Sequence, residues 1–224
     1  MSRKTTFSLG ENYHIYNRGN DKRVTFQNKT DYDRFIALLY LCNSVKNIRL
    51  SDYPKVKLEK LLDIKRGETI VDIGAYCLMP NHFHLLIHEK TENGISKFMQ
   101  KLLTAYTMYF NKKNERTGSL FSGLFKSTHA NEDEYLKYLF SYIHLNPIKL
   151  IEPMWKEKGI SDKKKANSFL NSYDYSSFLD FTEKQRKESV ILDKKHFPEY
   201  FKNFKEFNDF IENWLSFVNV KARP

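Results

Sequence analysis

The sequence predicts an α+β domain, because stretches with strand-like and helix-like spacing of apolar residues alternate along it. Residues 12–20 and 70–87 alternate in the manner of strands, while residues 30–45 and 95–110 repeat apolar side chains every three or four positions. The 224 residues, 41% of them hydrophobic, suit one core of about 150 residues with an appendage. We therefore predict a domain over residues 1–152 and a mainly helical C-terminal extension over residues 153–224.

The first half of the chain supplies one strand, one helix and a charged insertion. The strand predicted over residues 12–20 stops at Gly19-Asn20, where a polar turn begins. The helix over residues 30–45 carries a regular apolar stripe and is expected to pack on the core. Residues 46–67 are rich in lysine and are expected to form an exposed insertion with a short helix.

A hairpin with two histidines in its second arm is predicted over residues 70–87. Met79-Pro80-Asn81 forms its turn, and alternation along the second arm places His82 and His84 on one face. Neutral imidazoles so placed can share one divalent ion. The alternative is a pair of partly exposed histidines on an ordinary strand.

A long amphipathic helix is predicted from Gly94 to about Asn111, with Lys112 and Lys113 at its end. The loop that follows is basic and aromatic, and includes Arg116, Phe121 and Lys126. Phe121 can pack inward, as most phenylalanines do, or stack on a base.

The last helix of the domain is predicted to end near Asn146, because Pro147 disfavours helical backbone before it. Tyr142 and Asn146 lie four positions apart and therefore share one face of this helix. For Tyr142 the alternative to a chemical role is a tyrosine at the rim of the core, with its ring packed and its hydroxyl in water.

Charge and cysteine content limit the partners and the compartment. The chain has 37 Lys and Arg against 27 Asp and Glu, a formal charge of +10, which favours a polyanionic partner over a generic basic surface. Cys42 and Cys77 lack CxxC spacing, so a reducing cytoplasm is expected. There is no signal-like apolar start and no apolar run of about 18 residues, so no membrane partner is expected.

Four motifs, in order, resemble those of the single-tyrosine HUH transposases, and most closely the REP-associated tyrosine transposase group. They span roughly residues 7–152 and are Tyr13-His14-Ile15-Tyr16-Asn17-Arg18-Gly19, Ala75 to Leu86 with the sequence AYCLMPNHFHLL, Gly118-Ser119-Leu120-Phe121 with Phe125-Lys126-Ser127, and Tyr142-Ile143-His144-Leu145-Asn146-Pro147.

The resemblance implies a ferredoxin-like core with a central antiparallel sheet flanked by helices. It further implies that His82 and His84 are metal ligands, that Tyr142 is the nucleophile, and that Asn146 stands where relatives carry a polar residue able to complete the metal shell. One departure is Leu124, where many relatives have a basic residue, and it puts one phosphate contact in doubt.

The function implied is metal-dependent cleavage and strand transfer of single-stranded DNA beside a hairpin or palindrome, through a 5′-phosphotyrosine intermediate with Mg²⁺ or Mn²⁺. The enzyme would act as a monomer or a homodimer. The residues expected to contact DNA are Arg3, Lys4, Arg18, Lys112, Lys113, Arg116, Phe121 and Lys126.

Two other functions compete with this interpretation. One is a non-catalytic protein that binds nucleic-acid hairpins, in which the basic charge does the binding. The other is a zinc-dependent hydrolase built from Cys77, His82, His84 or His88.

Overall fold

The computed structural model describes residues 6–182, 184–197, 206 and 209. Arg3 and Lys4, two of the predicted DNA contacts, lie outside the described residues, as does nearly all of the aromatic pattern at residues 197–215 that predicted a helix in the extension.

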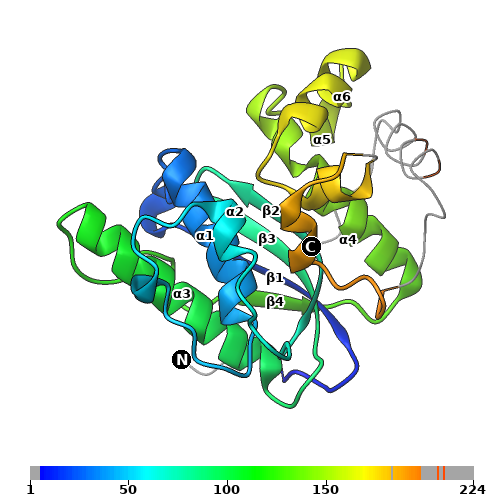
Figure 1. Ribbon diagram of the computed structural model, residues 1–224. Helices are drawn as coiled ribbons and strands as arrows, with labels where there is room; N and C mark the ends of the chain where they lie inside the picture. Colours follow the sequence, from blue (N-terminus) through cyan, green and yellow to red (C-terminus); the bar gives the residue numbers. More distant parts are fainter. Residues whose placement is uncertain (1–5, 183, 198–205, 207–208, 210–224) are drawn as a thin grey trace.

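Four antiparallel strands form a single sheet at the centre of the domain (Figure 1). They are β1 (Asn12–Arg18), β2 (Asp72–Met79), β3 (His82–His88) and β4 (Lys126–His129), in the order β2-β3-β1-β4. The prediction of strands from alternation is confirmed for β1, β2 and β3. Strand β4 has only four residues and no apolar alternation, so the sequence indicated a loop there.

Two long helices connect the strands. Helix α1 (Lys29–Cys42) joins β1 to β2, and α3 (Gly94–Lys113) joins β3 to β4. The order β-α-β-β-α-β with this strand arrangement is the ferredoxin-like topology. The predicted fold class is therefore confirmed. The short helix α2 (Leu58–Leu61) lies in the charged insertion.

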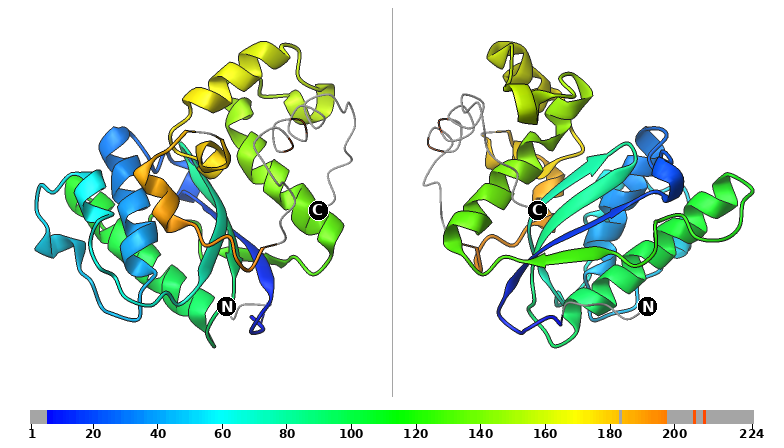
Figure 2. Two further views of the ribbon diagram at one scale, coloured as in Figure 1. Left: turned by 45° about the vertical axis from the view of Figure 1, so that its right-hand side comes forward. Right: turned by 180° about the vertical axis from the view of Figure 1, so that it is seen from behind.

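The sheet separates two apolar layers. Phe83, Leu85 and Ile87 of β3 are fully buried in a core shared with α1 and α3. Leu86 points to the other face and packs in a second core with α4 (Asp133–Leu145). Figure 2 shows α1 and α3 on one side of the sheet and α4 on the other. Alternation along β3 thus assigns one set of side chains to each layer.

After α4 the chain continues on the same side of the sheet as that helix up to Phe181, and Lys187–Ile191 then packs against α1, with Ile191 in the first core. Helices α5 (Trp155–Lys158) and α6 (Lys163–Ser172) are followed by two 3-10 turns, Ser177–Phe181 and Lys187–Ile191. Ala166, Leu170 and Phe178 of this segment are buried in the second core. The described part of the extension therefore docks on the domain.

The extension also covers the free edge of β2. The Leu78 amide donates to the Tyr175 carbonyl over 2.9 Å, and the Tyr173 hydroxyl donates to the Leu78 carbonyl over 2.6 Å. Cys77 forms an isolated antiparallel bridge with Ser176. An edge strand whose backbone groups are paired in this way has fewer free donors and acceptors for pairing with a strand of another chain.

A buried ion pair fixes the next turn of the extension. Arg186 donates to both carboxylate oxygens of Asp180, over 2.7 and 2.8 Å, and to the Tyr76 hydroxyl over 2.7 Å. Tyr76 belongs to β2, so the guanidinium joins the extension to the sheet. Removal of either charge would leave the other buried and uncompensated, which typically costs about 3–5 kcal/mol.

His144 links α4 to the same region. Its Nε2 lies 2.8 Å from the Ser177 hydroxyl, which also accepts a hydrogen bond from the Tyr76 amide over 2.8 Å. Burial lowers the pKa of His144 from 6.5 to about 3, with nearby Lys194 adding to the effect. The imidazole is therefore neutral in the folded protein above that pH.

The burial of His144 predicts acid-sensitive stability. Between pH 6.5 and about 3 the unfolded state binds a proton at this residue that the native state does not. The free energy of unfolding should therefore fall as the pH falls through this window, by about 1.4 kcal/mol per pH unit for one such histidine. In His144→Gln, urea unfolding at pH 6.5, 5.5 and 4.5 should show a slope shallower by that amount.

Ser177→Ala is the matched control, because it removes the hydrogen bond and keeps the buried imidazole. It should lower the unfolding free energy at every pH and leave the slope close to that of the wild type. Equal slopes for His144→Gln and the wild type would contradict this role of the buried histidine.

Candidate metal and nucleophile site

His82 and His84 open strand β3 and lie on the face of the sheet that α4 covers. Their ring centroids are 5.1 Å apart. Arg18 stands opposite His82 and Tyr16 opposite His84 in the pairing with β1. The His82 Nδ1 lies 2.7 Å from the Asn81 side-chain oxygen and donates to it, which leaves Nε2 with the lone pair.

Helix α4 brings Tyr142 over these histidines. The Tyr142 ring centroid lies 5.3 Å from that of His84, in an edge-on orientation, and the side chain is half-buried. The ring of Tyr138, one turn earlier, stacks on it at 5.8 Å. The helical face predicted to carry Tyr142 is therefore the face that meets the histidines.

Asn146 follows directly after α4 and completes the group. It is fully buried, and neither atom of its amide has a hydrogen-bond partner among the described residues. It lies close enough to His82 and Tyr142 to affect the pKa of both. A buried amide without partners costs roughly 1–3 kcal/mol, and its place beside His82 and Tyr142 makes its oxygen available to an ion held there.

The electrostatics favour neutral imidazoles and a protonated phenol. Burial, with Lys149 adding to it, lowers the pKa of His82 to about 4. Burial also lowers the pKa of His84 well below 6.5. Burial raises the pKa of Tyr142, and Asn146 opposes that rise. At neutral pH the two histidines thus have free lone pairs, as metal ligands require. Two imidazoles and an orphaned amide oxygen fit a divalent metal ion.

A third histidine belongs to this group and was missed in the sequence. His14 of β1 is buried, and its Nε2 lies 2.9 Å from the His84 Nδ1. Burial, with Lys156 adding to it, lowers the pKa of His14 to about 4. Because the His84 Nδ1 is engaged, its Nε2 is the atom left for a metal. Alternation in β1 places His14 and Tyr16 on one face, and this pattern is the sequence signal that could have identified His14.

Two lysines beyond α4 also border the site. The Nζ of Lys156, in α5, lies 3.8 Å from the centroid of the Tyr142 ring. Burial, with the nearby charge of Lys149 adding to it, lowers the pKa of Lys156 to about 8. The sequence around Lys156 is polar and shows no apolar periodicity, so only the fold reveals this contact.

Two of the basic residues predicted to contact DNA lie beside the histidines. Arg18 is exposed opposite His82, and Lys126 is exposed opposite Tyr16. Residues directly opposite each other in a sheet point to the same face, so both cations lie on the side of the site.

The other described candidates lie elsewhere. Lys112 and Lys113 end α3, which covers the opposite face of the sheet, and Lys113 pairs with buried Asp31 over 2.7 Å. Arg116 donates to the Asn111 side chain and to the Ser119 carbonyl.

Phe121 adopts the inward alternative. It is 4% exposed, and its ring packs edge-on against Phe83. A ring so placed has no free face on which a base could stack.

The residues proposed for a zinc hydrolase do not form a complete ligand set. Cys77 stands opposite His84, but burial raises the pKa of its thiol well above 9 and keeps it protonated. His88 lies six positions from His82 on β3, about 20 Å away at the usual rise per strand residue.

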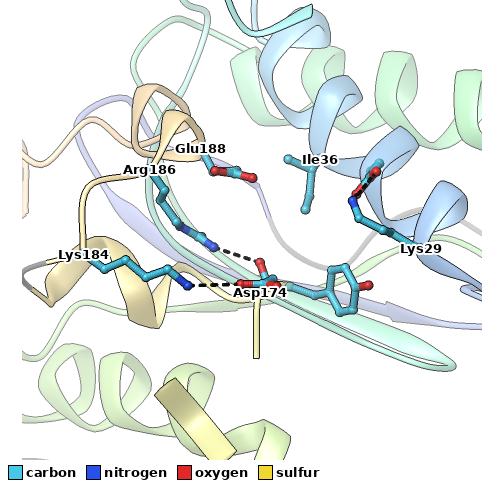
Figure 3. A pocket seen from close by; sticks show the side chains of 8 residues that line it. Lys29, Ile36, Asp174, Lys184, Arg186 and Glu188 are labelled. Carbon is cyan, nitrogen blue, oxygen red and sulfur yellow. Dashed lines mark hydrogen bonds and ion pairs between the residues drawn. The ribbon is translucent and has the colours of Figure 1, made fainter. Parts of the chain in front are cut away.

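A charged pocket of about 200 Å³ lies between α1 and residues 174–188 (Figure 3). The lysines that line it already form ion pairs with carboxylates of the same pocket. Lys29 pairs with Asp33 over 2.6 Å, and Lys184 pairs with Asp174 over 3.5 Å. The pocket shares no residue with the histidine site.

Another group of conventional metal ligands occurs among the described residues. Single ligand atoms of Asp72, His88 and His196 all lie within 4.8 Å of one another. Within the described parts of the chain, no helix is both long enough and apolar enough to cross a lipid bilayer.

A ferredoxin-like sheet with a His-x-His pair facing a helix-borne tyrosine is typical of a class of DNA-processing proteins, and the family comparison agrees. The family model described as "Transposase IS200 like" matches residues 11–146. The chain belongs to the IS200-like transposase family. The matched range includes His82, His84, Tyr142 and Asn146 and ends before Lys156.

One solved structure that this chain resembles is a REP-associated tyrosine transposase bound to a REP hairpin. The two share 14% sequence identity with a TM-score of 0.49, and the alignment covers 81% of this chain and 85% of the other. No curated protein matches the chain.

Proposed function

We propose that this member of the family is an active tyrosine transposase of the REP-associated kind, which cleaves and rejoins single-stranded DNA beside a hairpin. The observation that carries the proposal is the meeting, in one chain, of Tyr142 with two neutral histidines and an unpartnered buried amide. All the catalytic groups come from one chain, so a monomer suffices.

His82, His84 and the Asn146 side-chain oxygen would hold the metal ion. When bound, Mg²⁺ or Mn²⁺ would neutralise charge on the scissile phosphate and polarise its phosphorus–oxygen bonds. The oxygen of Asn146 and the oxygens of DNA and water make the assembled site harder than two imidazoles alone, which favours these ions over zinc.

Tyr142 supplies the nucleophile. Its hydroxyl oxygen attacks the phosphorus, a tyrosyl phosphate ester forms, and the bond from phosphorus to the 3′ oxygen breaks. The phenol proton is lost during attack, and the departing 3′ oxygen gains a proton. Because the ester conserves the bond energy, the 3′-hydroxyl of another strand can reverse the step and join DNA without ATP.

The surroundings of Tyr142 favour a single strand as substrate. The ring is half-buried between α4 and the sheet, so a splayed strand reaches its hydroxyl more readily than a stacked duplex does. Arg18, Lys126, Lys149 and Lys156 form a basic border that can bind successive phosphates. The hairpin preference follows from the motif resemblance to REP-associated transposases.

The central test is covalent capture of DNA. Labelled single-stranded hairpins from the flanks of the gene, incubated with Mn²⁺, should give a protein–DNA adduct on a denaturing gel with the wild type. Tyr142→Phe should reduce the adduct by at least about 10³-fold, because the phenylalanine has no nucleophilic oxygen. Chelation of the metal should abolish it as well.

Tyr138→Phe is the matched control, since it removes a phenol one turn away on the same helix. It should keep most of the adduct. Hairpin binding without any adduct across a broad set of hairpins would favour the non-catalytic binding protein instead.

Lys156 is expected to position the Tyr142 ring. A cation over an aromatic face contributes about 0.5–2 kcal/mol, so Lys156→Met should slow adduct formation at saturating DNA by roughly 3- to 30-fold. Lys156→Arg should retain most of the rate, because a guanidinium also stacks on aromatic rings. Single-turnover rates on one hairpin provide the measurement.

Lys158→Met serves as the comparison, because Lys158 is exposed on the same short helix. It removes the same charge without a contact to Tyr142. Equal rates for Lys156→Met and Lys158→Met would show that the contact with the ring is irrelevant.

A further inference from the structure

A second polar cluster lies on the same face of the sheet as His82 and His84, at the opposite end of β3. Three side chains stand in one row across the strands, since His88 of β3 is opposite both Asn12 of β1 and Asp72 of β2. His196, from the extension, closes over this row, and its ring stacks on that of His88 at 5.0 Å.

A bulge in β2 is what turns Asp72 toward this face. The pairing shifts by one residue between Ile73 and Ala75, with Gly74 as the extra residue. Without the shift, Asp72 and Ala75 would point to opposite faces, because they are three positions apart. With it, Asp72 lies on the same face as Ala75 and His88.

Asp72 is a fully buried carboxylate, and each of its oxygens contacts a different side chain. Its Oδ1 accepts from the Lys90 ammonium over 3.1 Å. Its Oδ2 lies 2.8 Å from the His196 Nδ1 yet has no hydrogen-bond partner of acceptable geometry. An ion bound by both atoms would take the place of this contact and move them slightly apart, to the spacing of two ligands.

His88 is oriented as a ligand. Its Nδ1 donates to the Asn12 side-chain oxygen over 3.1 Å. The Nε2 therefore keeps its lone pair. A metal-binding histidine characteristically donates its other ring nitrogen to an oxygen in this way.

Phe197 anchors His196 beside the row. A Cβ on Gly74 would lie 2.7 Å from the Phe197 ring, so the ring sits directly on the backbone of the bulge. The glycine that makes the bulge thus also admits the residue next to His196. The 47% exposure of the His196 side chain leaves it free to adjust to an ion.

We propose that Asp72, His88 and His196 form a second metal site, which binds zinc and fastens the extension to the sheet. One carboxylate and two imidazoles with a water in the fourth position is a common zinc donor set. Ligand atoms around tetrahedral zinc lie about 3.4 Å apart, and those of this cluster lie within 4.8 Å. Lys90 occupies only Oδ1 and leaves Oδ2 to the ion.

Zinc binding to the full chain tests the site. Because His82 and His84 can also bind zinc, the test compares variants in a His82→Gln/His84→Gln background after removal of metal by chelation. That background should bind one zinc per chain, measured by competition with a chromophoric chelator. At zinc 100-fold above its dissociation constant, the Tm should rise by about 5 °C.

Addition of His196→Gln should weaken this zinc binding at least tenfold and remove the rise in Tm. His196 is half exposed, so the variant is expected to fold, and its Tm without zinc provides the check. His129→Gln, which removes another partly exposed histidine, should leave zinc binding unchanged. Equal zinc affinity with and without His196 would overturn the proposal, as would no zinc bound in the starting background.

Asp72→Asn is the second variant. It keeps the shape of the side chain and removes the anionic ligand, so it should also weaken zinc binding by tenfold or more. If His196→Gln and Asp72→Asn both retain the zinc, it is bound elsewhere and the site is wrong. Neither result bears on DNA cleavage, since the background variant lacks the histidines of the first site.

Discussion

The two-residue period of strand β3 is the constraint on which the rest of this structure depends. Paired on both sides, by β1 and β2, the strand cannot rotate, so its alternate side chains are committed to opposite layers. Phe83, Leu85 and Ile87 enter the core under α1 and α3, which leaves His82, His84 and His88 on the other face. A slip of one residue would bury the histidines in the apolar core and expose the three apolar chains.

The second face is polar at both ends and apolar in the middle, and this pattern decides what can cover it. Leu86 supplies the apolar centre on which α4 packs, and the same helix carries Tyr142 to one end of the strand. The extension then covers the β2 edge, and Arg186 joins it to Tyr76 of that strand. Helix α5, shortly after α4, places Lys156 on the Tyr142 ring, although Lys156 lies outside the range that the family model matches.

The features that the sequence predicted correctly are those that depend on local periodicity or on ordered motifs. Alternation and helical spacing indicated β1, β2, β3, α1 and α3, and placed Tyr142 one turn from Asn146. Strand β4 was missed because its pairing with β1 depends on long-range contacts. His14 and Lys156 were missed for the same reason, since each reaches the site through the packing of one element on another. For Phe121 the sequence left two alternatives open, because composition alone did not decide whether its ring stacks on a base or packs in the core.

The two polar ends of β3 differ in charge, and that difference bears on when each would hold a metal ion. His82, His84 and Asn146 provide no negative charge, and Lys149 and Lys156 add positive charge nearby. A divalent cation would therefore bind there weakly until a phosphate supplies the missing anion, which couples the metal to DNA. At the other end Asp72 supplies its own buried anion, so an ion there needs no substrate. On these two proposals, β3 would carry one metal site that fills when DNA binds and another that fills without DNA.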